Sequence, residues 1–300
     1  MHTNEIISLT GRFLHNNVRY FSDLLQYILL IWLCKFRYKA QGVRVPCEYM
    51  INQFSRSELI YGKDAIERLK GCRVAIFGVG GVGGYVVEAL ARAGIGALDI
   101  IDNDDVSLTN INRQIIATHD TIGKSKLAVC EARIKILNPD CKVRGHQMFY
   151  LPETAGHFDF TEYDYVVDAV DTVSAKLDII ERCKSVGIPI ISCMGCGNRI
   201  DPTKLHIMDI AKTSMDPLAK VIRKGLKDRR IKGVKVLCST EEPIVPIIPE
   251  GGEAEYKGTA GRVAPGSTPF VPAAAGLAIA SEVVKDLTGF DSRERTKGGR

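Results

Sequence analysis

The most specific chemical signal in this chain is a glycine-rich run, Gly78-Val79-Gly80-Gly81-Val82-Gly83. It follows an apolar stretch at 73–77 and opens a stretch of helical spacing at 82–93. Glycines permit a tight turn and close backbone approach, and the free amides of a helix N-terminus attract phosphate. Asp102 lies about 20 residues further on, where a carboxylate can accept ribose hydroxyls. The pattern predicts a nucleotide site, and by itself it slightly favours NAD over ATP.

A polar loop after Asp102 changes that preference. An arginine can hold a phosphate through two hydrogen bonds, and amide side chains can orient a nucleotide. A lysine at the start of the next helix would oppose the helix dipole unless an anion neutralises it. The residues that therefore favour a nucleoside triphosphate are Asp104, Asn110, Arg113, Gln114, Lys124 and Lys126.

An acidic pair, Asp168 and Asp171, closes a later strand pattern. A carboxylate at the end of a parallel strand can hold Mg²⁺ beside phosphate oxygens, and we expect Asp171 to do so. Each polar residue taken singly could be an ordinary solvated side chain, but their order after the glycine turn supports a site. The chain has no evident His–Asp pair for hydride transfer, which opposes an NAD-dependent oxidoreductase.

Alternating strand and helix patterns must position these residues. Short β-branched runs predict strands, and apolar residues at helical spacing predict the helices between them. We expect strands at 73–77, 98–102, 165–170, 189–192, 205–210 and 234–238, and helices at 58–70, 82–93, 124–137, 173–185, 216–229 and 271–287. The fold class is therefore α/β: a Rossmann-like doubly wound sheet, mostly parallel, with a C-terminal mixed α/β extension.

Composition limits the class of protein further. The 300 residues are 45% hydrophobic and 25% charged, which indicates a packed globular core. A net charge of +5 permits an anionic partner without requiring one. The helix at 271–287 carries Glu282 and Lys285, so we expect a core helix and no membrane span.

Nine cysteines, scattered through apolar stretches, argue against a disulfide framework and indicate a reducing cytoplasm. Cys193 and Cys196 form one CxxC, which offers two ligands where a structural zinc site needs four. The alternative is two buried thiols at the end of a strand. Cys238 could be a thioester nucleophile, but its apolar surroundings favour a buried strand thiol.

The order of the chemical residues resembles the ubiquitin-activating-enzyme-like (ThiF/MoeB/HesA) adenylating superfamily. The resemblance rests on the glycine run and on Asp102, Asp104, Asn110, Arg113, Gln114, Lys126 and Asp171. In that family these positions bind ATP and Mg²⁺. A family arginine upstream of the first strand reaches an ATP phosphate, in relatives from the partner subunit, and Arg56 looks like that residue. The resemblance implies a homodimer in which Arg56, Arg113, Lys126 and Asp171 are catalytic.

Further segments resemble the branch that dehydrates threonylcarbamoyl-adenosine in tRNA. They are 54–62, 195–204, 209–213, 216–219, 265–267 and 270–272. The branch implies an ATP-dependent enzyme that adenylates the carboxylate of the modified nucleoside and cyclises it with release of AMP. Its implied partner is tRNA in the cytoplasm, with a sulfur-transfer or electron-donor protein as a further candidate and no membrane.

The basic helix expected at 216–229 is the candidate tRNA contact. One side carries the cations Lys220, Arg223, Lys224 and Lys227. The opposite side carries Leu218, Val221 and Leu226. A solvated amphipathic face is the ordinary alternative for such a helix.

The resemblance begins near Asn52 and divides the chain. Residues 24–34 are strongly apolar, but a membrane span needs about 20 such residues. They belong to an interfacial helix or to an extension foreign to the natural protein, and we expect the second, with Met50 as the natural start. We therefore expect an extension at 1–49, an adenylation domain at 50–290 whose substrate-binding part begins near 200, and a basic flexible tail at 291–300.

Two other functions stay open from the sequence. One is activation of the C-terminal Gly-Gly of a sulfur-carrier or ubiquitin-like protein. Members of that branch usually carry two CxxC pairs for zinc, and this chain has one. The other is a non-catalytic tRNA-binding protein that retains the fold, which the intact ATP positions oppose.

Overall fold

The computed structural model describes residues 51–248 and 265–291 of the chain. Our predictions for the extension at 1–49, for Met50 as a start and for the tail lie outside the described residues, except that Asp291 is described.

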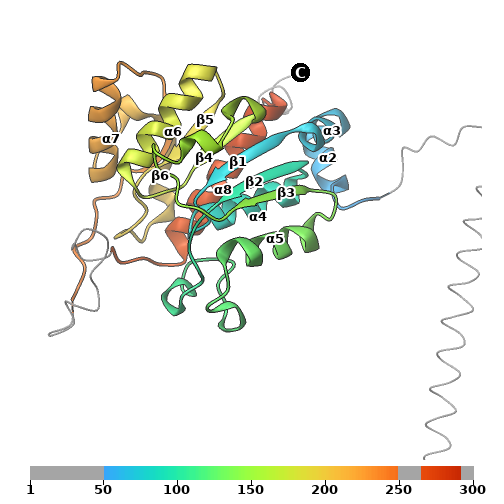
Figure 1. The fold of residues 1–300 in the computed structure, drawn as a ribbon, viewed down its shortest axis with the longest axis horizontal. Coiled ribbons are helices and arrows are strands. Elements are labelled where there is room, and N and C mark those ends of the chain that lie inside the picture. The colour runs from blue at the N-terminus through green and yellow to red at the C-terminus, as the bar shows by residue number, and fades with distance from the viewer. Residues whose placement is uncertain (1–50, 249–264, 292–300) are drawn as a thin grey trace, which may run out of the picture. The chain divides into compact units, whose positions relative to one another are not determined.

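Within these two ranges a single sheet of seven strands forms the centre of the fold (Figure 1). The order of the strands is β3-β2-β1-β4-β5-β7-β6, and only the β6–β7 pair is antiparallel. The strands are β1 (Arg73–Phe77), β2 (Ala97–Ile101), β3 (Lys142–His146), β4 (Tyr165–Asp168), β5 (Ile190–Cys193), β6 (Leu205–Asp209) and β7 (Lys235–Ser239). The predicted doubly wound, mostly parallel α/β class is confirmed, and β6 with β7 forms its mixed part.

Helices cover both faces of the sheet. They are α2 (Ser55–Tyr61), α3 (Lys63–Gly71), α4 (Gly83–Ala93), α5 (Lys126–Leu137), α6 (Val173–Val186), α7 (Pro217–Asp228) and α8 (Phe270–Thr288). Because side chains alternate along a strand, Val74 and Ile76 pack under α3, α4, α5 and α8, while Ala75 and Phe77 pack under α6 and α7. The parallel strands inside the sheet, β1, β2, β4, β5 and β7, are therefore buried on both faces.

The single helix expected at 58–70 is wrong. Two helices, α2 and α3, meet at Gly62, whose φ of 86° and ψ of 157° no α-helix contains. Glycine alone adopts this conformation readily, because it has no Cβ. The apolar spacing continues across the break, so the periodicity did not reveal it.

The strand β3 was missed altogether. It pairs in parallel with β2 at the edge of the sheet, and most of its side chains are exposed or half-buried. An edge strand with polar side chains has no apolar run to mark it.

The apolar helix α8 is a core helix, as expected. Val271, Ala275, Ile279 and Val283 are buried along one side of it. No helix in the described ranges is long and apolar enough to cross a membrane.

Candidate active site

A cavity of about 640 Å³ lies at the carboxyl ends of β1, β2 and β4. Residues just beyond all three strands line it, among them Gly78, Asp102 and Asp171. The strand β1 pairs with β2 on one side and with β4 on the other, so the chain reverses its direction of winding here. Open α/β sheets bind their ligands in the crevice at such a switch point.

The glycine turn forms the floor of this cavity. Gly80 and Gly81 line it, and α4 begins at Gly83. A Cβ atom on Gly83 would lie 1.8 Å from the carbonyl oxygen of Gly78, so no other residue fits there. The turn thus brings backbone and the N-terminal end of a helix to the cavity, which suits phosphate groups.

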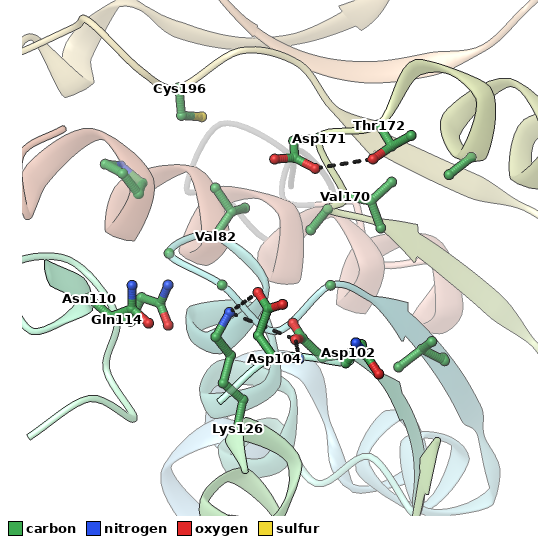
Figure 2. A pocket seen from close by; sticks show the side chains of 18 of the residues that line it. Val82, Asp102, Asp104, Asn110, Gln114, Lys126, Val170, Asp171, Thr172 and Cys196 are labelled. Atoms are coloured by element: carbon green, nitrogen blue, oxygen red, sulfur yellow. Dashed lines mark hydrogen bonds and ion pairs between the residues drawn. The ribbon is translucent and has the colours of Figure 1, made fainter. Parts of the chain in front are cut away.

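Asp102 braces the glycine turn as well as facing the cavity. Its Oδ2 accepts a hydrogen bond of 2.7 Å from the amide of Val79, and its Oδ1 accepts one of 2.9 Å from the amide of Asp104. The buried Lys126 donates to Oδ2 of Asp104 at 2.7 Å, and its Nζ lies 3.8 Å from Oδ1 of Asp102 (Figure 2). These acids offset a cation at the start of α5, whereas Lys124 is exposed and lies outside the cavity lining.

The amide and arginine side chains of the polar loop also line the cavity. Asn110 is buried and accepts from the amide of Ser107, and Arg113 donates to the carbonyl of Thr109 at 2.8 Å. Gln114 is buried, and its Oε1 has no hydrogen-bond partner within the described ranges. A buried acceptor without a donor is costly, so this oxygen points to a ligand with a hydroxyl or amino group, as a nucleotide has.

Of the acidic pair, only Asp171 faces the cavity. Its side chain is exposed, and Oδ1 accepts from the hydroxyl of Thr172 at 3.4 Å (Figure 2). A carboxylate so lightly engaged is free to bind a cation beside phosphate oxygens. Asp168 instead points into the protein, where it is buried.

A buried ion pair behind Asp171 escaped sequence reasoning. Nζ of Lys176 lies 3.1 Å from Oδ2 of Asp168 and donates to the carbonyl of Cys193 at 2.6 Å. Ser192 donates to the same carboxylate, and all three polar side chains are fully buried. The available signal was the position of Lys176 on the apolar side of its helix, in line with Ile179 and Ile180.

Arg56 does not reach the cavity of its own chain. It is exposed on α2 and is absent from the cavity lining. Its near neighbour in the chain, Phe54, fixes where this segment lies. The ring of Phe54 packs against Gly94, at the end of α4 remote from the glycine turn. Since α4 has 11 residues, about 16 Å of helix separate that contact from the turn.

The predicted face of α7 is partly wrong. Lys220, Lys224 and Lys227 are exposed as expected, but Arg223 is half-buried and donates to the carbonyl of Thr213 at 2.9 Å. Val221, expected on the buried side, is 50% exposed. The buried positions are Ala219, Ile222 and Leu226, because packing against α6 sets the rotation of the helix. All four cations lie away from the cavity lining.

The cysteines that bear on chemistry are either buried in strands or placed at the cavity. Cys238 is buried in β7, and burial raises its pKa to about 12, which fits a strand thiol and opposes a thioester nucleophile. Cys193 is buried, and Cys196 lines the cavity. In the described part of the chain, no group of three or more His, Cys, Asp or Glu side chains could hold a metal ion. Among the described residues, the CxxC thus has two thiols where a structural zinc site needs four ligands.

The fold and the cavity together define a doubly wound α/β protein with a nucleotide site at the carboxyl edge of its sheet. The chain belongs to the ThiF family, whose model matches residues 54–298. This membership confirms the adenylating superfamily that the sequence resembles.

Relatives of known name support the narrower branch. The chain is 46% identical over 242 residues to the tRNA threonylcarbamoyladenosine dehydratase of Bacillus subtilis (strain 168). The aligned region covers 79% of this chain and 95% of the relative. It is 38% identical over 202 residues to the protein of that name from Escherichia coli (strain K12), covering 65% of this chain and 75% of the relative. The crystal structure of the E. coli enzyme in complex with ATP has a TM-score of 0.71 and 34% identity, and covers 81% of this chain and 96% of that one. The resemblance to this branch is confirmed.

Proposed function

We propose that this chain uses ATP to adenylate the carboxylate of threonylcarbamoyl-adenosine in tRNA and then closes the adenylated group into a ring. The observation that carries the proposal is the cavity, which combines a glycine turn, buried Lys126, Arg113 and the exposed carboxylate of Asp171. The B. subtilis relative named tRNA threonylcarbamoyladenosine dehydratase, matched over 95% of its length, supports the choice of substrate.

The chemistry needs positioning and charge more than it needs a protein nucleophile. A carboxylate is a poor acyl donor, and transfer to the α-phosphate of ATP provides AMP as a good leaving group. The amides at 80–83, with Lys126 and Arg113, would hold and partly neutralise the triphosphate. The carbamoyl group can then attack within the same molecule, where effective molarities reach about 10⁵–10⁸ M. Loss of AMP completes a net dehydration.

We propose Asp171 as the protein ligand of Mg²⁺. Its exposed carboxylate at the end of β4 suits a hard cation that also binds phosphate oxygens. The ion would supply positive charge where negative charge develops on the attacked phosphate.

Mass spectrometry of tRNA nucleosides tests the proposed reaction. The substrate is tRNA that carries threonylcarbamoyl-adenosine in its open, uncyclised form. Incubation with the protein, ATP and Mg²⁺ should yield a nucleoside lighter by one water, together with AMP and pyrophosphate. A protein that shows pyrophosphate exchange only with a Gly-Gly carrier protein is instead the sulfur-carrier type. A protein that binds tRNA but shows neither reaction is the non-catalytic alternative.

We further propose a cytoplasmic homodimer in which Arg56 completes the site of the partner subunit. Its position, at the far end of α4 from the glycine turn, supports action in trans. Arg56→Ala and Asp171→Ala should each be inactive alone, yet activity should partly return when they are mixed, because a mixed dimer contains one intact site. Turnover of the mixture is the measurement. Demonstrated subunit exchange without any recovery contradicts the proposal.

The part of the domain from 200 onward, including α7, is our proposed tRNA surface. Replacing Lys220, Lys224 and Lys227 with Gln should weaken tRNA binding about tenfold or more at physiological salt and flatten its salt dependence, since fewer counterions are released. Filter binding at several salt concentrations measures both effects. The control replaces Lys63, Lys135 and Lys142, which lie on other elements. Equal losses in the two triple variants would mean that α7 has no special role. A sulfur-transfer or electron-donor partner stays a prediction.

A further inference from the structure

The loop after β5 carries two thiols at the wall of the cavity. Cys193 is the last residue of the strand and is buried, while Cys196 lines the cavity on the far side from Lys126 (Figure 2). Their Sγ atoms are 3.6 Å apart. Of the cysteines that the structure describes, Cys196 is the one that is not buried. The pair therefore combines one accessible thiol with one sheltered thiol.

The surroundings make the accessible thiol the more reactive of the two. The thiol contact with Cys193 lowers the pKa of Cys196, and this effect, with the positive charges of Arg199 and Lys176, outweighs the opposing effects of burial and of the Asp216 carboxylate. The same contact, together with burial, raises the pKa of Cys193. Since the thiolate is the attacking species, Cys196 reacts first and Cys193 second.

We propose that Cys193 and Cys196 are a redox site, which forms a reversible disulfide at the cavity wall by exchange with a small disulfide such as oxidised glutathione. The site is separate from the adenylation chemistry, which uses neither sulfur. A metal is the competing use of a CxxC, and the described residues offer no third His, Cys, Asp or Glu ligand.

The exchange balances in two steps. The thiolate of Cys196 attacks one sulfur of the small disulfide, which forms a mixed disulfide and expels one small thiolate. Cys193 then loses its proton and attacks Sγ of Cys196, which forms the internal disulfide and expels the second thiolate. The two small thiolates take up the two protons released by the cysteines. The protein dithiol is oxidised by two electrons, and the small disulfide is reduced to two thiols.

The loop geometry lets the bond close. A disulfide needs an S–S distance of about 2.05 Å, so the two sulfurs must approach by about 1.5 Å. Cys193 is held in β5, which pairs with β7, and its carbonyl accepts from Lys176. Cys196 instead lies between Gly195 and Gly197, so we expect its side of the pair to move.

This movement would reach the nucleotide end of the cavity. A Cβ on Gly197 would lie 2.6 Å from the ring of Pro265, so the loop and the segment at 265–267 are in close contact. The carbonyl of Ser267 in turn accepts from Asn112, the neighbour of Arg113. We therefore expect a bound nucleotide to shield Cys196, an expectation that rests on the proposed function.

Peptide mapping of the full chain tests the redox site. The protein is incubated with oxidised glutathione, quenched, alkylated with iodoacetamide and digested with trypsin. The tryptic peptide Ser185–Arg199 contains Cys193 and Cys196 and no other cysteine. After oxidation it should carry an internal disulfide and no alkyl group. The disulfide should form at least about tenfold faster than glutathione adds to the other described cysteines, and dithiothreitol should reverse the change. Full alkylation of this peptide, or a lasting glutathione adduct at Cys196, overturns the proposal.

Variants and nucleotide sharpen the test. Cys193→Ser should stop at the glutathione adduct of Cys196, whereas Cys238→Ser, a buried thiol on the neighbouring strand, should behave as wild type. An internal disulfide that still forms in Cys193→Ser would overturn the assignment. Saturating ATP should slow the reaction at least about fivefold, because Cys196 lines the cavity. A disulfide that forms equally fast with ATP supports the redox site and counts against the nucleotide assignment of the cavity.

Discussion

Asp171→Asn is expected to bind ATP within about tenfold of wild type and to adenylate the tRNA carboxylate at least about a hundredfold more slowly. The carboxylate stands at the end of β4, apart from the contacts of the glycine turn with Asp102, so nucleotide binding should survive. Loss of a charge that positions the metal ion would cost about 3–4 kcal/mol in the transition state, comparable to one oxyanion donor. Single-turnover kinetics with titrated ATP measures rate and affinity separately.

Asp102→Ala is the matched variant and should show the opposite pattern. It removes the acceptor of the Val79 amide, and the glycine turn loses its brace. ATP binding should weaken more than the rate at saturating ATP falls. If Asp171→Asn reaches the normal rate once ATP saturates, Asp171 serves only binding and its catalytic assignment fails.

Lys176→Met is expected to lower the free energy of unfolding by about 3–5 kcal/mol. The substitution leaves the carboxylate of Asp168 buried without its cation, and an uncompensated buried charge is strongly destabilising. Urea unfolding followed by circular dichroism gives the change, and the midpoint of thermal unfolding should fall by about 10 °C.

Two controls separate the ion pair from the loss of a lysine. Lys184→Met changes an exposed lysine on the same helix and should cost less than about 1 kcal/mol. Replacing both partners, Lys176→Met with Asp168→Leu, should recover part of the loss, because an apolar pair carries no stranded charge. Equal losses from Lys176→Met and Lys184→Met would show that the ion pair contributes little.

Local patterns were sufficient for the elements that the sequence predicted well. The strand at 73–77, the glycine run and the following helix lie next to each other in the chain, and each follows from its own apolar spacing and turn residues. The carboxyl ends of parallel strands meet at one edge, so Asp102 and Asp171 could be assigned to one site before any contact was known.

Elements defined by their neighbours were predicted poorly. The strand β3 exists because the edge of β2 offers hydrogen-bonding partners, and its own residues are polar. The rotation of α7 depends on its packing against α6, which exposes Val221. The break between α2 and α3 depends on the backbone of a single glycine, Gly62, which apolar spacing does not report.

The sequence by itself determined the class of fold, the nucleotide turn and the set of residues that gather around it, because these follow from short-range spacing and from the rule that strand ends meet. Only the tertiary structure decided that Asp102 braces the turn, that Lys176 neutralises Asp168, that Arg56 lies far from its own cavity, and that Cys196 lines the cavity. Each of these depends on distances between segments remote in the chain. Packing sets such distances, and no local pattern contains them.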